Sequence, residues 1–175
     1  MTELIRVEPE RFFADRFQVT PSLMERLLGS SLRGRVDDAD IYLEHRVNED
    51  LSLEEGQVKR ASRHVSQGAG VRAQAGTRTG YAHTDEISIR NLEEAARQAR
   101  SIADQASTSG TLAVPTRRPH DLYSLAEPPI VTDLQKKLSL LRSIDGAARA
   151  ADPRVRQVMA SIASEDVVVL VATAS

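Results

Sequence analysis

The stretch GAGVRAQAGTRTGYAHTDE, residues 68–86, carries the residue types that most often bind phosphates or metals: closely spaced glycines, arginines and a histidine. A glycine-rich loop binds phosphate when a helix follows it directly, because the helix N-terminus presents free backbone N–H groups to the anion. This stretch lacks the glycine spacing of a dinucleotide-binding loop and the Gly-Lys-Ser/Thr of a nucleotide-binding loop. A strand, and not a helix, is expected to follow its first glycines. We therefore interpret the glycines as structural residues of turns or of a bulge, at places that need a positive φ; they are Gly68, Gly70, Gly76 and Gly80.

Four histidines are the candidate metal ligands. His45, His64 and His83 are each nineteen residues apart, a spacing that could place them on successive strands, while His120 lies in a different segment. Zinc sites in proteins use cysteine, histidine and carboxylate ligands. This chain has no cysteine, no His-x-x-x-His and no His-Glu pair, and its serines lack the Gly-x-Ser-x-Gly pattern of a nucleophile. The sequence therefore predicts no catalytic residue and no metal site in this chain.

Basic side chains gather on the same part of the sequence, from Lys59 to Arg78, while acidic residues occupy the expected turns. The simpler interpretation is a solvated face of a sheet. The alternative is a sheet edge that captures an extended acidic or C-terminal peptide by strand addition. The candidate contacts for a peptide or partner are Arg72, Arg78, Tyr81 and His83.

Composition narrows the class of protein. Lys and Arg number 23 against 25 Asp and Glu, and this balance argues against a nucleic-acid partner, which usually meets a basic surplus. The first residues do not read as a signal peptide and no apolar run is long enough to span a membrane, so a cytoplasmic protein without a membrane partner is expected. Aromatic residues make up only 3% of the chain, so the core must consist of Val, Leu, Ile and Ala.

Periodicity predicts an α+β fold, in which an antiparallel meander sheet is packed by two long helices. Alternation begins a strand at 41–47, and turns are expected at 48–50 and 54–56. Strands at 58–66 and 71–75, separated by QGAG, and a final strand YAHT complete the meander. Helices are expected within 20–29, 87–106 and 132–153, the first capped by Thr20 or Ser22, and residues 154–175 read as a hairpin that turns at 164–166.

Three regions follow from this pattern. Residues 1–106 form helix, antiparallel sheet and helix; residues 107–131 form a Pro-rich connection; residues 132–175 form helix and hairpin. Residues 39–53 align with residues 155–169, each after a helix, which suggests an internal helix-hairpin repeat. The second copy lacks the strands and helix that follow the first, so residues 132–175 are expected to be a truncated part of the same domain as the first region.

Residues 39–88 contain SLEEGQVK, GAGVR and GTRTGYAHTD in that order. These phrases closely resemble the N-terminal region of the TldD branch of the TldD/PmbA (TldE) metallopeptidase family, also called the modulator of DNA gyrase family. The resemblance implies a two-part zinc metallopeptidase with an N-terminal α+β region and a C-terminal β-rich region. The family's metal ligands, a His-Glu-x-x-x-His helix and a further cysteine, lie in the C-terminal part, and no position of this sequence matches them.

The resemblance gives three hypotheses. The first is that the chain is the N-terminal, non-catalytic portion of a TldD-like protein that degrades or processes small unfolded peptides, inactive alone, with zinc only in the full-length protein. Its partners would be the peptide substrate and a TldE/PmbA-like or identical subunit. The second is a stand-alone peptide-binding module without enzymatic activity, and the third, a gyrase-associated protein, is disfavoured by the balanced charge.

Overall fold

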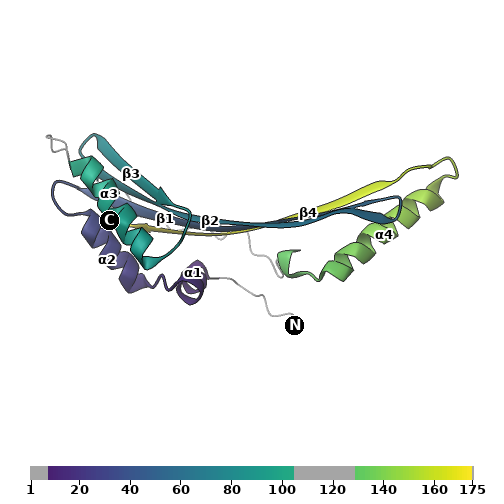
Figure 1. The fold of residues 1–175 in the computed structure, drawn as a ribbon, viewed down its shortest axis with the longest axis horizontal. Helices are drawn as coiled ribbons and strands as arrows, with labels where there is room; N and C mark the ends of the chain where they lie inside the picture. Colours follow the sequence, from purple (N-terminus) through teal and green to yellow (C-terminus); the bar gives the residue numbers. More distant parts are fainter. Residues whose placement is uncertain (1–7, 105–128, 175) are drawn as a thin grey trace. The chain divides into compact units, whose positions relative to one another are not determined.

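The computed structural model describes residues 8–104 and 129–174 (Figure 1). The α+β class is confirmed: helices accompany a four-stranded antiparallel sheet of order β3-β2-β1-β4. In chain order the elements are α1 (Pro9–Phe17), α2 (Pro21–Ser31), β1 (Asp38–Glu54), β2 (Gln57–Ala75), β3 (Arg78–Thr84), α3 (Ile89–Asp104), the 3-10 turn η1 (Pro129–Val131), α4 (Leu134–Ala151) and β4 (Met159–Thr173). Most of the expected Pro-rich connection lies outside the described residues.

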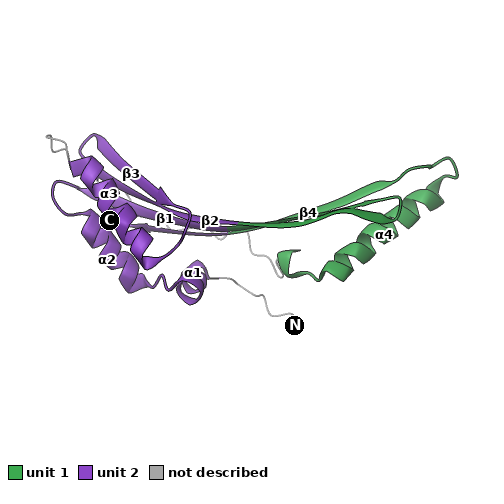
Figure 2. Cartoon of the chain, viewed as in Figure 1, with its two compact units in different colours: residues 1–5, 46–65, 125–167 green, residues 6–45, 66–124, 168–175 purple. Residues whose placement is uncertain are grey.

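The chain forms two compact units (Figure 2). Unit 1 contains residues 46–65 and 125–167 together with residues 1–5, and unit 2 contains residues 6–45, 66–124 and 168–175. Strands β1, β2 and β4 therefore contribute residues to both units.

The core of unit 2 lies between the sheet and the helices α2 and α3. Alternate strand residues such as Ile41, Leu43 and Val71 are fully buried there, together with Phe13 of α1. Helix α3 buries an apolar stripe made mostly of alanine; the buried members are Leu92, Ala95, Ala96, Ala99 and Ala103. Ile102 of the same helix is half exposed, because it lies at the margin of the apolar face.

The helix starts follow the predicted capping chemistry. The Thr20 hydroxyl accepts a hydrogen bond from the backbone N–H of Leu23 at 3.3 Å, with Pro21 in the first turn of α2. The Asp133 carboxylate accepts from the backbone N–H of Gln135 at 2.7 Å at the start of α4. Each side chain satisfies a donor that the helix itself leaves without a partner.

Three expected strand breaks are wrong. Residues 48–50 lie inside β1, residues 164–166 lie inside β4, and the QGAG segment lies inside β2. Acidic residues at the first two positions serve ion pairs instead of turns, since Glu49 pairs with Lys137 and Glu165 with Arg46. The two hairpins expected to turn at 48–50 and 164–166 in the helix-hairpin repeat are therefore not formed. What recurs is a helix followed by one long strand.

The turn interpretation is also wrong for Gly68, Gly70 and Gly80, which lie within strands without positive φ. Gly76 lies in the turn between β2 and β3 with φ 58°. At Gly80 the requirement is space: a Cβ there would lie 2.0 Å from the carbonyl oxygen of Ala99 in α3. Helix α3 thus approaches β3 too closely for any side chain at this position.

The core of unit 1 is smaller. Leu138 and Leu141 of α4 pack against Leu51 and Leu53 of β1. Beside them the Lys137 side chain is only 6% exposed, and its Nζ pairs with the Glu49 carboxylate, which also lies 3.5 Å from Nη1 of Arg63. A buried ammonium needs such a partner, because its desolvation is otherwise uncompensated.

We expect Gly80→Ala to destabilise the chain by about 1–3 kcal/mol, since the added methyl overlaps the backbone of α3. The matched control is Gly29→Ala in α2, where nothing lies within 4 Å of the new Cβ and stability should hold or rise. Chemical denaturation of both variants measures the difference. Equal stability of the two would show that α3 does not contact β3 as described.

We expect Glu49→Gln to cost roughly 3 kcal/mol of unfolding free energy, because Lys137 is left buried without its countercharge. Asp50→Asn, at the exposed neighbouring position, should cost much less. Adding Lys137→Met to Glu49→Gln should recover most of the loss, which a double-mutant cycle by denaturant unfolding would measure. Additive losses in the double variant would contradict the pairing.

Candidate functional site

One face of the sheet in unit 2 carries a network centred on Arg72. Its neighbours Val71 and Ala73 are buried in the core, so strand alternation places Arg72 on the face opposite α2 and α3. The guanidinium contacts two carboxylates of β1: Nη2 lies 3.3 Å from Oδ2 of Asp38, and Nε and Nη2 pair with Asp40. Nη1 also donates to the Gln74 side chain at 3.0 Å. Arg72 is therefore already held by two opposite charges.

Two exposed rings lie beside this network. Tyr81 is directly opposite Arg72 in the β2–β3 register, and His83 is opposite Gly70. Directly opposite residues of an antiparallel pair share a face, so Arg72, Tyr81 and His83 lie together. The Tyr81 and His83 rings stack with centroids 6.2 Å apart and an interplanar angle of 21°, and Tyr81 is 59% exposed.

Gly70 makes room for this arrangement. A Cβ at Gly70 would lie 2.5 Å from the hydroxyl oxygen of Tyr81, so the ring lies over bare backbone. Arg78, the fourth candidate contact, is opposite Ala75 and has the strand phase of Gly80 and Ala82, so it does not join the other three. The residue types could be identified from the sequence. The strand register, which places Arg72, Tyr81 and His83 together and Arg78 apart from them, could not.

The histidines do not converge. His45 is buried at 4% exposure and packs between the rings of Phe12 and Phe17, with centroids 5.1 and 6.1 Å away, on the helix-covered side of unit 2. His83 lies on the opposite face, His64 is an exposed strand residue of unit 1, and His120 lies outside the described residues. Within residues 8–104 and 129–174, no group of three or more His, Asp or Glu side chains is arranged to hold a metal ion.

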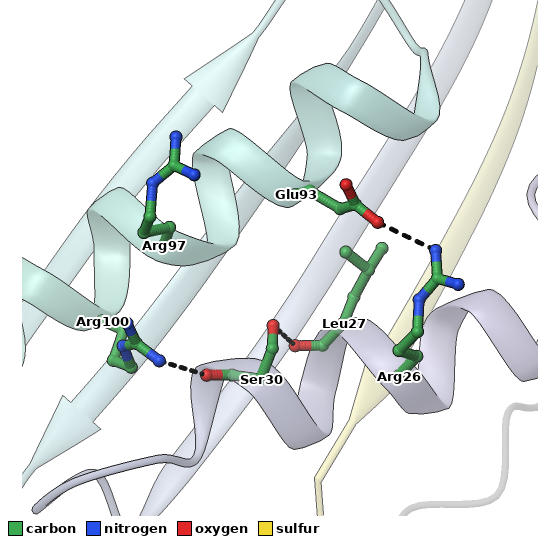
Figure 3. Close-up of a pocket in the computed structure, with 6 residues that line it drawn as sticks. All are labelled: Arg26, Leu27, Ser30, Glu93, Arg97 and Arg100. Carbon is green, nitrogen blue, oxygen red and sulfur yellow. Dashed lines mark hydrogen bonds and ion pairs between the residues drawn. The ribbon is translucent and has the colours of Figure 1, made fainter.

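Helices α2 and α3 border a pocket of about 270 Å³, whose lining the sequence did not reveal (Figure 3). Nη2 of Arg26 donates to Oε1 of Glu93 at 2.9 Å, and Nη1 of Arg100 donates to the carbonyl oxygen of Ser30 at 3.2 Å. The Ser30 hydroxyl donates to the carbonyl oxygen of Leu27 at 2.8 Å. The Arg26–Glu93 and Arg100–Ser30 contacts join the two helices.

One ionisable pair in unit 1 has a shifted pKa. Hydrogen bonds from the side chain and backbone of Arg154 hold the pKa of Asp152 below its ordinary value, and the same side-chain bond raises the pKa of Arg154. Both groups follow α4 at the surface, and Asp152 also accepts from the backbone N–H of Arg154 at 2.8 Å. The carboxylate stays ionised in this turn, which suits a structural role and not acid-base chemistry.

Taken together, the Arg72–Tyr81–His83 face offers exposed rings beside a polar network. Exposed rings stack on apolar or planar groups, and their polar atoms form hydrogen bonds with an extended chain.

No helix among the described residues has the length and apolarity needed to cross a membrane.

The chain has clear relatives. Residues 39–103, which run from β1 to α3, match the family described as PmbA/TldA metallopeptidase domain 1. The protein named metalloprotease TldD homolog of Haemophilus influenzae is 34% identical to this chain, over 77% of this chain and 29% of that protein. The protein of the same name from Buchnera aphidicola subsp. Schizaphis graminum is also 34% identical, over 73% of this chain and 26% of that protein. The chain thus spans less than a third of the length of these relatives.

A solved structure shares the fold. The crystal structure of TldE from Thermococcus kodakarensis superposes with a TM-score of 0.56 at 21% identity, covering 86% of this chain and 35% of that one. At this identity the likeness shows the fold alone.

We expect the chelator-washed chain to retain no stoichiometric zinc, since it has no cysteine and its described histidines are separated. Elemental analysis by mass spectrometry, before and after incubation with zinc and dialysis, measures the content. One zinc per chain that survives dialysis and is lost in His83→Ala would contradict this expectation.

Proposed function

This chain belongs to the TldD branch of the PmbA/TldD family and matches its N-terminal region, and on that premise we propose that it is the non-catalytic portion of a zinc metallopeptidase that degrades or processes small unfolded peptides. The observation that carries the proposal is the match of residues 39–103 to the first domain of a metallopeptidase family. The 34% identity to proteins named as TldD metalloprotease homologs supports it.

The residues of this chain do not fit the metal. The sequence has no cysteine and no His-Glu pair, and the described histidines lie on different surfaces. Zinc in such a protein supplies an activated water that attacks the peptide carbonyl. We assign no step of that reaction to this chain, and propose instead that its sheet helps to position a peptide.

The positioning role rests on the exposed face of unit 2. Tyr81 and His83 present stacked rings there, and Arg72 is fixed by Asp38 and Asp40. An extended peptide laid across this face would meet aromatic surface beside a rigid polar network, without a charge that it must neutralise. We propose a TldE/PmbA-like or identical subunit as the protein partner and the cytoplasm as the location.

A second candidate function is a stand-alone peptide-binding module. The same exposed rings favour it, because they need no metal to bind a peptide. A nucleic-acid function has less support, since the net charge of the chain is -2.

The test compares the 175-residue chain with the product of the complete reading frame that encodes it. We expect the complete product to cleave a quenched fluorescent peptide without stable structure, and chelation to abolish this cleavage, while the 175-residue chain leaves the peptide intact. Metal-dependent cleavage by the 175-residue chain would refute the non-catalytic role. Peptide binding by a complete product that cleaves nothing would favour the module.

A further inference from the structure

Part of strand β2 in unit 1 has an open edge. Strand β3 pairs with β2 only from Ala69 to Ala75, so the part of β2 at residues 57–65 has β1 on one side and no other strand beside it among the described residues. We call residues 57–65 the β2 edge. Every one of these residues is exposed, although they form a regular strand. Their backbone N–H and C=O groups on the outer side form a template for another strand.

The β2 edge is also positively charged. It contains Lys59, Arg60, Arg63 and His64, and the whole of β2 has no Asp or Glu, in a chain whose net charge is -2. Strand alternation places Lys59 and Arg63 on one face, and Arg60 and His64 on the other. Arg63 lies 3.5 Å from Glu49, whereas Lys59 and Arg60 have no ion pair among the described residues. Positive charge therefore flanks the open backbone on both faces.

The open backbone edge and the positive charge indicate which kind of strand would bind to the β2 edge. Like charges repel when strands pair, so the β2 edge of a second copy is a poor neighbour. A strand with carboxylates at alternate positions, by contrast, places a negative charge against the basic side chains on each face while its backbone completes the ladder. Val58 and Val65, which are 44% and 46% exposed, would be partly covered by such a strand.

We infer that the β2 edge, residues 57–65, binds an extended acidic peptide segment by strand addition. This goes beyond the proposed function, because it needs neither a metal nor cleavage, and it concerns unit 1 instead of the Arg72–Tyr81–His83 face. Failure of the peptidase assay would leave it standing.

Fluorescence anisotropy with the 175-residue chain tests the inference. The probe is a labelled octapeptide that alternates Thr and Glu. The first control is the octapeptide that alternates Thr and Lys. The second is the Thr-Glu octapeptide with N-methyl groups on its two central residues, because these groups block hydrogen bonding along both edges of the peptide strand. A labelled octamer of deoxythymidine represents a nucleic-acid partner. We expect the Thr-Glu peptide to bind, the Thr-Lys peptide not to bind, and N-methylation to weaken binding at least about tenfold.

Charge reversal locates the site. Lys59→Glu with Arg60→Glu should weaken binding of the Thr-Glu peptide at least about tenfold, because two attractive charges become repulsive. The matched control reverses two exposed charges of α4 in the same unit, Lys136→Glu with Arg142→Glu, and should leave binding within about twofold. If the first variant fails to fold, as judged by circular dichroism, Lys59→Gln with Arg60→Gln replaces it.

Four results would overturn the inference. They are no binding of the Thr-Glu peptide, equal binding of its N-methylated form, equal loss in the α4 variant, and tighter binding of the deoxythymidine octamer. Equal binding of the N-methylated peptide would show that charge attracts the peptide without strand pairing. Tighter binding of the deoxythymidine octamer would show that these residues form a surface for polyanions.

Discussion

The close approach of helix α3 to strand β3 is the constraint on which unit 2 depends. At Gly80 the backbone of the strand lies against Ala99 and Ala103 of the helix, with no room for a Cβ. A chain with only 3% aromatic residues has few large side chains to fill a wide gap, so its layers must come close together. Alanines of β2 and β3 are buried in the same core as the alanines of α3; they are Ala69, Ala73, Ala75 and Ala82. The polar face follows, since the strand residues that alternate with the buried ones, such as Arg72, point away from the helices.

Unit 1 is stabilised differently. Its small apolar cluster is accompanied by the buried Lys137–Glu49 pair, which replaces apolar volume with charge at the contact between α4 and β1. An ion pair of this kind adds little net stability compared with apolar residues, but it specifies which positions face one another. Glu49 thus gives α4 one specific partner on the strand, beside the contacts of the leucines.

Helices α2, α3 and α4 and most strand residues were predictable, because capping residues and hydrophobic periodicity are local signals. Thr20 caps its helix as expected, and the odd-numbered residues of β1 from Ala39 to Val47 are buried. The turn signals failed where long-range contacts outweigh local preference: Glu49 and Glu165 look like turn residues until their partners Lys137 and Arg46 are known. The site was hidden for a related reason: the final strand was expected to begin at Tyr81, whereas β3 begins at Arg78, and this earlier start sets the register that places Tyr81 opposite Arg72.

Strands β1, β2 and β4 supply residues to both compact units, so the units cannot be separated as successive stretches of the gene. No single cleavage of the backbone frees one unit from the other, and recombination cannot exchange a unit as a module. A residue inserted into β1 between the units would move every later side chain to the other face unless β2 and β4 changed with it. Substitution is therefore the permitted route of evolutionary change within these strands, and length variation belongs in the turns and helix connections.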